Sequence, residues 1–388
     1  MKKKVLVLRT MPYDFDPNSY NVQEIGIGKA FCKLGYDYDY ITVKKRDQKE
    51  WVFYEENGCR AKWIEVPRLR VLRMGFNFDV CKKEFLEQYD YVICREYYQL
   101  MTHLVAKNSN NASFYSGPYW NMFMIPFMSY VYDFFYTKKL NKNAKCKFVK
   151  SDLAKAFLEK KGYTDVKTVG VALDTERFDS CNEMTDDTKK IVDYMNSNDC
   201  ILYIGTLDKN KNYMFLLQVY EKLLEKNPDL KFVVIGKSKQ SAVAKLMGKK
   251  DESYEESCYE KISPETKKGI YRVNRVENPQ LKYIYPLAKA FLLPSKLEIF
   301  GMVMLEAMYL KAPVVTSKNG GSVTLIEGKD TGKMIDEFDV TRWADAVQEY
   351  LDDEEKTRQI AENAHATVRD KYNWDYIVKT MLADMEEK

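Results

Sequence analysis

The sequence predicts an α/β protein of two domains, each organised around a parallel sheet. Its 388 residues exceed the size at which a single hydrophobic core keeps growing. Continuous apolar runs at Val5–Leu8 and Cys200–Ile204 are typical of parallel strands that are covered on both faces. Each run is followed by a loop and then by a segment with helical periodicity, and this alternation is typical of nucleotide-binding α/β domains.

The composition is that of a globular protein and argues against several other classes. Hydrophobic residues make up 45% of the chain, and the formal net charge of +4 is too small to indicate nucleic-acid binding by itself. The eight cysteines are scattered singly and only two histidines are present, so we expect reduced thiols and no structural zinc. The apolar run near the amino terminus is short and ends at Arg9, which indicates a strand rather than a signal peptide. No stretch has the length of a clean membrane span, and we expect a cytoplasmic protein.

The amino-terminal half opens with a strand–helix–strand unit. A helix is expected from Asn21 to Leu34, where Gly35 provides a C-terminal cap, and a β-rich run follows at Tyr38–Val43. A later helix is expected at Ser151–Lys161. Further strands are expected at Ala61–Val66, Tyr89–Cys94, Ser113–Tyr115, Lys147–Val149 and Val166–Val171.

The segment Tyr115–Tyr136 has the most unusual composition in the chain, because aromatic residues and methionines are interrupted by only a few polar ones. One interpretation is an amphipathic segment at a membrane surface, with aromatic side chains in the interface and lysines facing anionic headgroups. The other is a partly buried helix packed on the sheet of the first domain. Both remain open, and the segment is too polar to span a bilayer. The lysines that follow it are Lys138, Lys139, Lys142, Lys145 and Lys147.

The carboxyl-terminal half shows the same alternation of strands and helices. The strand Cys200–Ile204 stops at Gly205, and a loop at residues 206–212 leads into a helix at Tyr213–Lys226. The polar segment Asp179–Asp199 before this strand is expected to be a linker. The later elements expected in this half are strands at Lys231–Ile235 and Gly269–Val273 and a Tyr-rich helix at Asn278–Leu287.

The stretch Phe291–Gly321 is the most informative part of the sequence. It predicts a buried strand, a turn, a tight loop, and a helix from Met302. Unpaired N–H groups and the helix dipole at such a helix N-terminus favour an anion. Glu298 lies in the loop, and Glu306 lies about one turn into the helix. Two carboxylates beside an anion site suit a ligand with a phosphate in the middle and hydroxyl-rich groups at both ends, such as a nucleotide-sugar.

The pattern Pro-Ser-x-x-Glu-x-Phe-Gly-x-x-x-x-Glu-Ala-Met at residues 294–308, followed by Pro-Val-Val and Gly-Gly, resembles the Glu-x7-Glu signature of retaining GT-B glycosyltransferases of the family-four type. This resemblance implies two Rossmann-like domains that face each other across a cleft, with a C-terminal helix that crosses back to the first domain. Tyr372-Asn373-Trp374 is similar to the family's terminal signature. The implied division is residues 1–174 with 372–388 for the acceptor domain and residues 175–371 for the nucleotide-sugar donor domain.

The resemblance also implies roles for the residues of this stretch. Glu298 would contact the donor sugar, and Glu306 would contact the ribose hydroxyls. The family's Glu-Gly-Phe-Gly loop has Ile299 at its second position in this chain, and an isoleucine does not take positive φ cheaply, so the loop is expected to bend differently. The backbone N–H groups expected to face the diphosphate are those of Phe300, Gly301 and Met302.

A second group of donor-binding residues comes from earlier in the same half. Gly205 and Lys211 match the family's phosphate-binding loop, but Thr206 stands where the family has an arginine. Because the bidentate guanidinium is lost, Lys211 would carry more of the diphosphate charge, and it is predicted to be catalytic together with Glu298. The residue pair Val273-Asn274 lies where the family holds the base. Candidates to assist Lys211 are Lys209 and Arg272.

The acceptor side is the part that the resemblance covers only in outline. In the family the first loop is glycine-rich, whereas this chain has Ser19, Tyr20 and Asn21 there. Asn21 could supply a polar contact or could cap the helix. The family often places a histidine in the first domain, but His103 falls within an expected helix and is predicted to be structural. The remaining acceptor-side candidates are Tyr119 and Trp120.

These observations predict a retaining hexosyltransferase that moves a sugar from a UDP-sugar or GDP-sugar to a hydroxyl acceptor. The predicted acceptor is a saccharide or a lipid-linked saccharide of bacterial surface-polysaccharide assembly, reached at the inner face of the membrane. No cofactor and no metal are expected, because protein cations would neutralise the diphosphate. Two alternatives stay open: a nucleotide-sugar 2-epimerase of the same architecture, and a non-catalytic partner subunit that keeps the fold.

Overall fold

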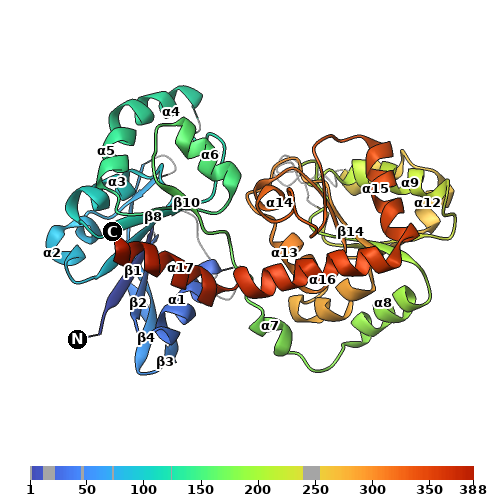
Figure 1. Cartoon of the computed structure of the whole chain (residues 1–388), viewed down its shortest axis with the longest axis horizontal. Coiled ribbons are helices and arrows are strands. Elements are labelled where there is room, and N and C mark those ends of the chain that lie inside the picture. Colours follow the sequence, from blue (N-terminus) through green and yellow to red (C-terminus); the bar gives the residue numbers. More distant parts are fainter. Residues whose placement is uncertain (1, 12–21, 45–47, 72–73, 124, 239–253) are drawn as a thin grey trace, which may run out of the picture. The chain divides into compact units, whose positions relative to one another are not determined.

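The computed structural model of the chain describes residues 2–11, 22–44, 48–71, 74–123, 125–238 and 254–388. The chain forms two units (Figure 1). Unit 1 comprises Met1–Ala172 together with Lys371–Lys388, and unit 2 comprises Leu173–Asp370. The predicted boundaries lie after residues 174 and 371.

Unit 1 contains an eight-stranded sheet in the order β10-β9-β8-β7-β1-β2-β4-β3. Its strands pair in parallel except for β3, which pairs with β4 in the antiparallel sense. The strand order reverses on the two sides of β1, as in doubly wound folds. The strands of unit 1, including the small β5–β6 pair, are β1 (Lys4–Arg9), β2 (Asp37–Lys44), β3 (Lys49–Glu56), β4 (Cys59–Pro67), β5 (Leu69–Val71), β6 (Met74–Phe76), β7 (Tyr91–Arg95), β8 (Ala112–Ser116), β9 (Lys147–Val149) and β10 (Val166–Thr168).

The hairpin β3–β4 is a feature that the sequence analysis missed, since only part of β4 was expected. Its two-residue turn is Asn57-Gly58, and both residues have positive φ, 53° and 70°. An Asn-Gly pair between alternating residues is a strong hairpin signal, because both turn positions need the left-handed region. The signal was therefore present in the sequence.

The helices of unit 1 connect and cover its strands. The core between them contains residues from both, among them Leu6, Val92, Phe114 and Leu158, each with at most 1% of its surface exposed. The helices are α1 (Gln23–Lys33), the 3-10 turn η1 (Asp79–Cys81), α2 (Lys83–Leu86), α3 (Leu100–Asn108), α4 (Pro126–Tyr132), the π-helical turn η2 (Asp133–Thr137), α5 (Lys138–Asn143), α6 (Asp152–Lys160) and α17 (Trp374–Glu387).

Unit 2 contains a six-stranded sheet in the order β13-β12-β11-β14-β15-β16, and all its pairs are parallel. The strand order reverses between β11 and β14. In open α/β sheets, ligands bind outside the carboxyl ends of the strands at such a reversal. The strands are β11 (Cys200–Ile204), β12 (Lys231–Ile235), β13 (Ile270–Val273), β14 (Ala290–Leu293), β15 (Val314–Ser317) and β16 (Lys333–Ile335).

Two expectations for unit 2 are corrected by its helices. The polar segment that was expected to be a linker instead contains the helix α8. This helix is hydrophilic overall but buries Ile191 and Met195. The expected helix at residues 278–287 is instead two 3-10 segments, η3 and η4, each with a proline at its start. The helices are α7 (Glu176–Asp179), α8 (Asp186–Asn196), α9 (Tyr213–Leu224), α11 (Tyr254–Tyr259), α12 (Pro264–Lys268), η3 (Asn278–Tyr283), η4 (Tyr285–Leu287), α13 (Met302–Tyr309), α14 (Gly320–Leu325), α15 (Val340–Asp352) and α16 (Glu354–Lys371).

The carboxyl-terminal helix α17 is part of unit 1 and packs on α1 (Figure 1). Asn373 caps α17 by accepting the N–H of Tyr376 at 2.8 Å, and Trp374 is 7% exposed. The Trp374 ring lies directly over Gly26 of α1, because a Cβ atom on Gly26 would lie 2.1 Å from the ring. A glycine at residue 26 is therefore what allows the two helices to approach.

We predict that Gly26→Ala lowers the free energy of unfolding of unit 1 by about 1–3 kcal/mol, because the added methyl group overlaps the Trp374 ring. Chemical denaturation followed by tryptophan fluorescence measures the change. The control is Lys379→Ala on the exposed side of α17, which should change stability little. Equal stability of Gly26→Ala and the control would contradict the proposed packing.

Candidate functional site

The loop after β11 is shaped by one carboxylate, that of Asp208. Its Oδ1 accepts the N–H groups of Asn210 and Lys211 at 2.9 and 2.8 Å, and its Oδ2 accepts the Thr206 hydroxyl at 3.2 Å. Gly205 at the end of the strand is bonded through its N–H to the Ile235 carbonyl at 2.9 Å. Thr206 is exposed, and its side chain contacts the loop itself. These contacts fix the backbone from which Lys211 projects.

The loop after β11 is joined to the loop after β14, across the point where the strand order reverses. The carbonyl of Asn210 accepts the N–H of Lys296 at 2.8 Å, and its Nδ2 donates to the Leu297 carbonyl at 3.1 Å. One residue further along both loops, Lys211 Nζ forms an ion pair with Glu298 Oε2. Each of these two side chains is about four-fifths buried. The two residues predicted to be catalytic therefore lie in contact.

Helix α13 (Met302–Tyr309) begins four residues after Glu298. Gly301 precedes it with φ of +80°, and Met304 N–H donates to the Gly301 carbonyl at 2.9 Å. No carboxylate stands in the first turn of α13, so its amino end presents N–H groups and positive potential. Ile299 is not among the described residues with positive φ, so the left-handed position of this loop is Gly301. Phe300 is buried, and its carbonyl packs so closely on Gly321 that a Cβ there would lie 1.9 Å away.

Glu306 is 1% exposed, and its carboxyl group is held by neutral donors. Asn278 Nδ2 donates to Oε1 at 3.0 Å, and the Tyr285 hydroxyl lies 3.4 Å from Oε2. Burial raises the pKa of Glu306 to about 7, against the lowering effect of the Asn278 and Tyr285 hydrogen bonds and of the Arg177 charge. A carboxyl group with this pKa can accept or donate a hydrogen bond near neutral pH.

The predicted base-binding turn lies at the end of β13. The Val273 carbonyl accepts the Gly236 N–H at 3.0 Å, and Asn274 is exposed. Arg272 was a candidate to assist with phosphate, but its guanidinium forms a two-point ion pair with Glu255 of α11, at 2.5 and 3.2 Å. The structure therefore gives Arg272 a role in holding α11 on the sheet.

The acceptor-side candidates belong to unit 1. Asn21 falls outside the described residues. Tyr119 and Trp120 follow the carboxyl end of β8, are partly exposed, and form an edge-to-face pair with centroids 4.8 Å apart. His103 is buried in α3 against the Tyr136 ring, and burial lowers its pKa.

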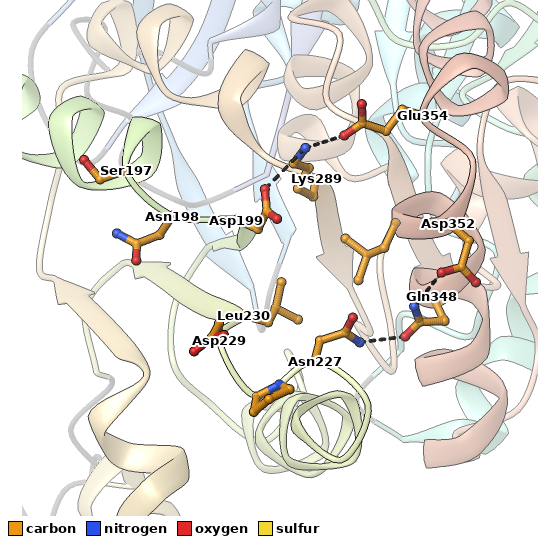
Figure 2. Close-up of a pocket in the computed structure, with 12 residues that line it drawn as sticks. Ser197, Asn198, Asp199, Asn227, Asp229, Leu230, Lys289, Gln348, Asp352 and Glu354 are labelled. Atoms are coloured by element: carbon orange, nitrogen blue, oxygen red, sulfur yellow. Dashed lines mark hydrogen bonds and ion pairs between the residues drawn. The ribbon is translucent and has the colours of Figure 1, made fainter.

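Unit 2 also has a cavity of about 430 Å³ at the opposite edge of its sheet (Figure 2). Its lining includes Asp199, Leu230 and Lys289, the residues that precede β11, β12 and β14. Lys289 pairs with Asp199 at 3.3 Å and with Glu354 at 2.7 Å, and Asn227 donates to Gln348 at 2.7 Å. Because these polar groups bond to one another at the amino ends of the strands, we infer that they stabilise the fold and do not form a ligand site.

Several residues of the site were missed by the sequence analysis. Asn210, which joins the two loops, carried a local signal, since it stands next to Lys211. Asn278 and Tyr285 reach Glu306 from segments more than twenty residues away. No pattern within the sequence reports that contact. Among the described residues, no group of three or more His, Cys, Asp or Glu side chains is arranged to hold a metal ion.

Two doubly wound units, with the last helix returning to the first, define the two-domain GT-B fold. The chain superposes on a solved structure described as trehalose-6-phosphate from E. coli bound with UDP-2-fluoro glucose. The alignment covers 100% of this chain and 99% of that structure's chain, with a TM-score of 0.73 and 12% sequence identity. The predicted fold class is thus confirmed.

Residues 185–367, which lie within unit 2, match the model of the family described as glycosyl transferases group 1. A D-inositol 3-phosphate glycosyltransferase of Corynebacterium urealyticum is 30% identical over 254 residues, which are 62% of this chain and 56% of that protein. The capsular polysaccharide biosynthesis glycosyltransferase CapM of Staphylococcus aureus is 24% identical over 201 residues, 50% of this chain and 49% of that protein. The chain spans about half the length of the curated relatives that it matches.

The pKa of Glu306 gives a prediction for stability. Because its folded-state pKa is raised above the usual value of 4.5, the folded chain binds the proton more tightly, and the carboxyl's contribution falls as pH rises from about 5 to 8. Glu306→Gln removes this titration, and the Tyr285 hydroxyl can accept from the new amide while it donates to the Val303 carbonyl. The variant should gain roughly 2 kcal/mol relative to the parent between pH 5 and 8.

Denaturant unfolding of both chains across this pH range tests the prediction. Glu327→Gln, at an exposed carboxylate of the same unit, serves as the control and should show no such trend. A stability difference between Glu306→Gln and the parent that does not vary with pH would show that Glu306 titrates normally.

Proposed function

We propose that the chain is a retaining glycosyltransferase that takes its sugar from a nucleoside diphosphate donor, with UDP as the favoured nucleotide. The observation that carries this proposal is the meeting of Lys211 and Glu298 beside the amino end of α13, at the strand-order reversal of unit 2. The relatives named above are glycosyltransferases, and the E. coli structure is described as bound to a UDP-sugar analogue. These names support the same class of donor.

In the proposed reaction an acceptor hydroxyl oxygen bonds to the anomeric carbon while the bond from that carbon to the diphosphate oxygen breaks. The bonding electrons leave with the diphosphate, which gains negative charge and takes up the hydroxyl proton. The Lys211 ammonium and the N–H groups of Phe300, Gly301 and Met302 stabilise that charge. Because Glu298 and the diphosphate compete for one ammonium, donor binding releases the Glu298 carboxylate toward the sugar hydroxyls.

The other donor contacts follow from the same geometry. Glu306, one turn into α13, faces the ribose, and its neutral partners Asn278 and Tyr285 leave it able to accept from a hydroxyl. The turn Val273-Asn274 supports the base. Thr206, exposed beside Gly205, offers a hydroxyl near the phosphates in place of a guanidinium. No cofactor or metal takes part in this proposal.

The two alternatives make different products. An epimerase would release an isomer of the donor sugar, and a non-catalytic partner would leave the donor unchanged. A transferase slowly hydrolyses its donor and consumes it faster when an acceptor is present. The contact between Lys211 and Glu298, which pairs a phosphate-binding cation with a sugar-binding acid, favours the transferase.

We predict that Lys211→Ala and Glu298→Ala each lower kcat for donor consumption by about 100-fold or more, since each removes a group aimed at the reacting centre. Release of UDP from a set of UDP-sugars, with and without acceptor, measures the effect. The control is Lys267→Ala, an exposed lysine of α12 at the opposite edge of the sheet, which should retain full turnover. Unchanged turnover in both site variants would refute the site assignment.

The proposed acceptor is a saccharide carried on a lipid, which requires that the chain reach a membrane surface. Of the described helices, none is both long enough and apolar enough to cross a bilayer. The segment after β8 instead packs one face on unit 1 and exposes the other. Tyr132 is buried and donates to the Tyr97 carbonyl at 2.6 Å, while Phe134 on the outer face is 80% exposed. The buried face agrees with a helix packed on the sheet, and the exposed face is the one that we propose for membrane contact.

The outer face forms an aromatic and basic surface. An exposed group of large apolar side chains on one short segment marks an interaction site. Asp133, the acidic residue within this segment, pairs with Lys161, and exposed lysines of α5 stand beside the aromatics. A cationic rim around aromatic side chains suits an anionic bilayer interface. The surface consists of Ile125, Phe127, Met128, Tyr130, Phe134 and Phe135, with Lys138, Lys139 and Lys142.

We predict that the chain co-sediments with vesicles that contain anionic phospholipid and that Phe134→Ser/Phe135→Ser lowers this partition at least about tenfold, because two exposed rings leave the interface. Leu69→Ser, at an equally exposed apolar residue elsewhere in unit 1, is the matched control. Equal partition of the parent and the double variant would contradict the assigned surface.

A further inference from the structure

A group of buried charges lies at the carboxyl edge of the sheet of unit 1. Arg9, Arg95 and Lys150 stand at or directly after the ends of β1, β7 and β9, so they share this edge. Arg95 is 4% exposed and Lys150 is 7% exposed. Strands β1 and β7 meet at the reversal of strand order in unit 1, where doubly wound sheets bind ligands, and β9 lies two strands beyond β7 on the same side.

The carboxylates near these cations are already engaged. Glu24 of α1, 2% exposed, lies 3.4 Å from Arg9 Nη1 and 3.3 Å from Arg95 Nε, so two guanidinium groups share it. Glu96 accepts the Ser116 hydroxyl at 2.8 Å and the Gly117 N–H at 3.2 Å. Glu96 holds this position with φ of +70°, a conformation that non-glycine residues rarely adopt.

Arg95 and Lys150, in contrast, each keep a donor that no acceptor among the described residues meets. The Lys150 ammonium has no hydrogen-bond or ion-pair partner among the described residues, and it lies 5.4 Å from the centre of the Tyr115 ring. Arg95 lies over the same ring at 4.6 Å, and its buried Nη1 has no hydrogen-bond acceptor in the described part of the chain. Burial and the neighbouring Arg95 charge lower the pKa of Lys150 to about 7. A buried ammonium that lacks an acceptor costs stability unless an anion meets it.

We propose that Arg95 and Lys150 form a binding site for an anionic oxygen group, of phosphate or carboxylate chemistry, at the carboxyl edge of the sheet of unit 1. The Lys150 ammonium supplies a positive charge and three hydrogen-bond donors. The Arg95 guanidinium, which lies over the same Tyr115 ring, supplies a further donor at Nη1. Tyr119 and Trp120 follow the neighbouring strand β8 at the same edge and offer aromatic surface to the rest of such a ligand. If the chain transfers sugars as proposed above, this group belongs to the acceptor.

The site is tested with inorganic phosphate and with acetate, each compared with chloride at equal ionic strength. Four of the five tryptophans lie in unit 1, at residues 51, 63, 120 and 374, so tryptophan fluorescence during heating reports mainly on this unit. All measurements use the full chain with Lys211→Ala, which removes the phosphate contact proposed in unit 2. At a phosphate concentration about tenfold above its dissociation constant, the thermal midpoint should rise by about 3 °C.

Lys150→Met, added to the Lys211→Ala chain, should abolish the phosphate-dependent shift. Lys147→Met is the matched control, because Lys147 is an equally buried lysine in the same strand region but at its amino end, and the shift should persist there. An acetate shift equal to that of phosphate would assign the site to carboxylates, and a larger phosphate shift would assign it to phosphates.

Equal phosphate shifts with and without Lys150→Met, or no shift in the Lys211→Ala chain, would overturn the proposal. Neither result depends on donor consumption, which is measured separately as UDP release from the parent chain. Failure of this site is therefore distinct from failure of the proposed transfer reaction. Absence of UDP release from the parent chain, with a phosphate shift retained in the Lys211→Ala chain, would instead refute the proposed function and leave the anion site standing.

Discussion

The ion pair between Lys211 and Glu298 is the interaction on which the site in unit 2 depends. It joins the loops that follow β11 and β14, the two strands between which the strand order reverses. Asp208 and Asn210 fix the backbone on one side, and Gly301 and Gly321 allow the close packing on the other. The chain therefore holds the proposed phosphate-binding cation and the proposed sugar-binding acid in contact, and in our proposal the donor diphosphate replaces Glu298 as the anionic partner of Lys211.

The two units share a doubly wound topology but differ in the charges at the reversal of strand order. In unit 2 the cation at the reversal is paired with a carboxylate, whereas in unit 1 the described residues offer no acceptor to the Lys150 ammonium or to Arg95 Nη1. The first arrangement suits a ligand that must be released as a more negative product. The second suits an anion that stays bound while chemistry occurs elsewhere on the same molecule. This difference is the physical reason why we propose a donor site in unit 2 and a site for an anionic acceptor in unit 1.

Much of the fold and part of the site could be predicted from the sequence, because their signals are local. The strands Cys200–Ile204 and Lys231–Ile235 have the predicted bounds, since each contains an uninterrupted apolar run. The hairpin at Asn57-Gly58 was missed although its turn signal was present. Contacts that close over long sequence separations could not be predicted: Asn278 and Tyr285 on Glu306, Glu255 on Arg272, and Arg95 with Lys150 over Tyr115. The sequence shows which side chains are chemically reactive or charged, and the fold determines which of them are in contact.

The central claim is that Lys211 and the amino end of α13 hold the diphosphate of a nucleotide-sugar. The most direct test is a crystal structure of the chain with an intact or fluorinated UDP-sugar. The account predicts diphosphate oxygens within hydrogen-bonding distance of Lys211 Nζ and of the N–H groups at residues 300–302, with the sugar at Glu298 and the ribose at Glu306. A diphosphate bound anywhere else on unit 2, including the cavity of Figure 2, with the Lys211–Glu298 ion pair undisturbed, would contradict it.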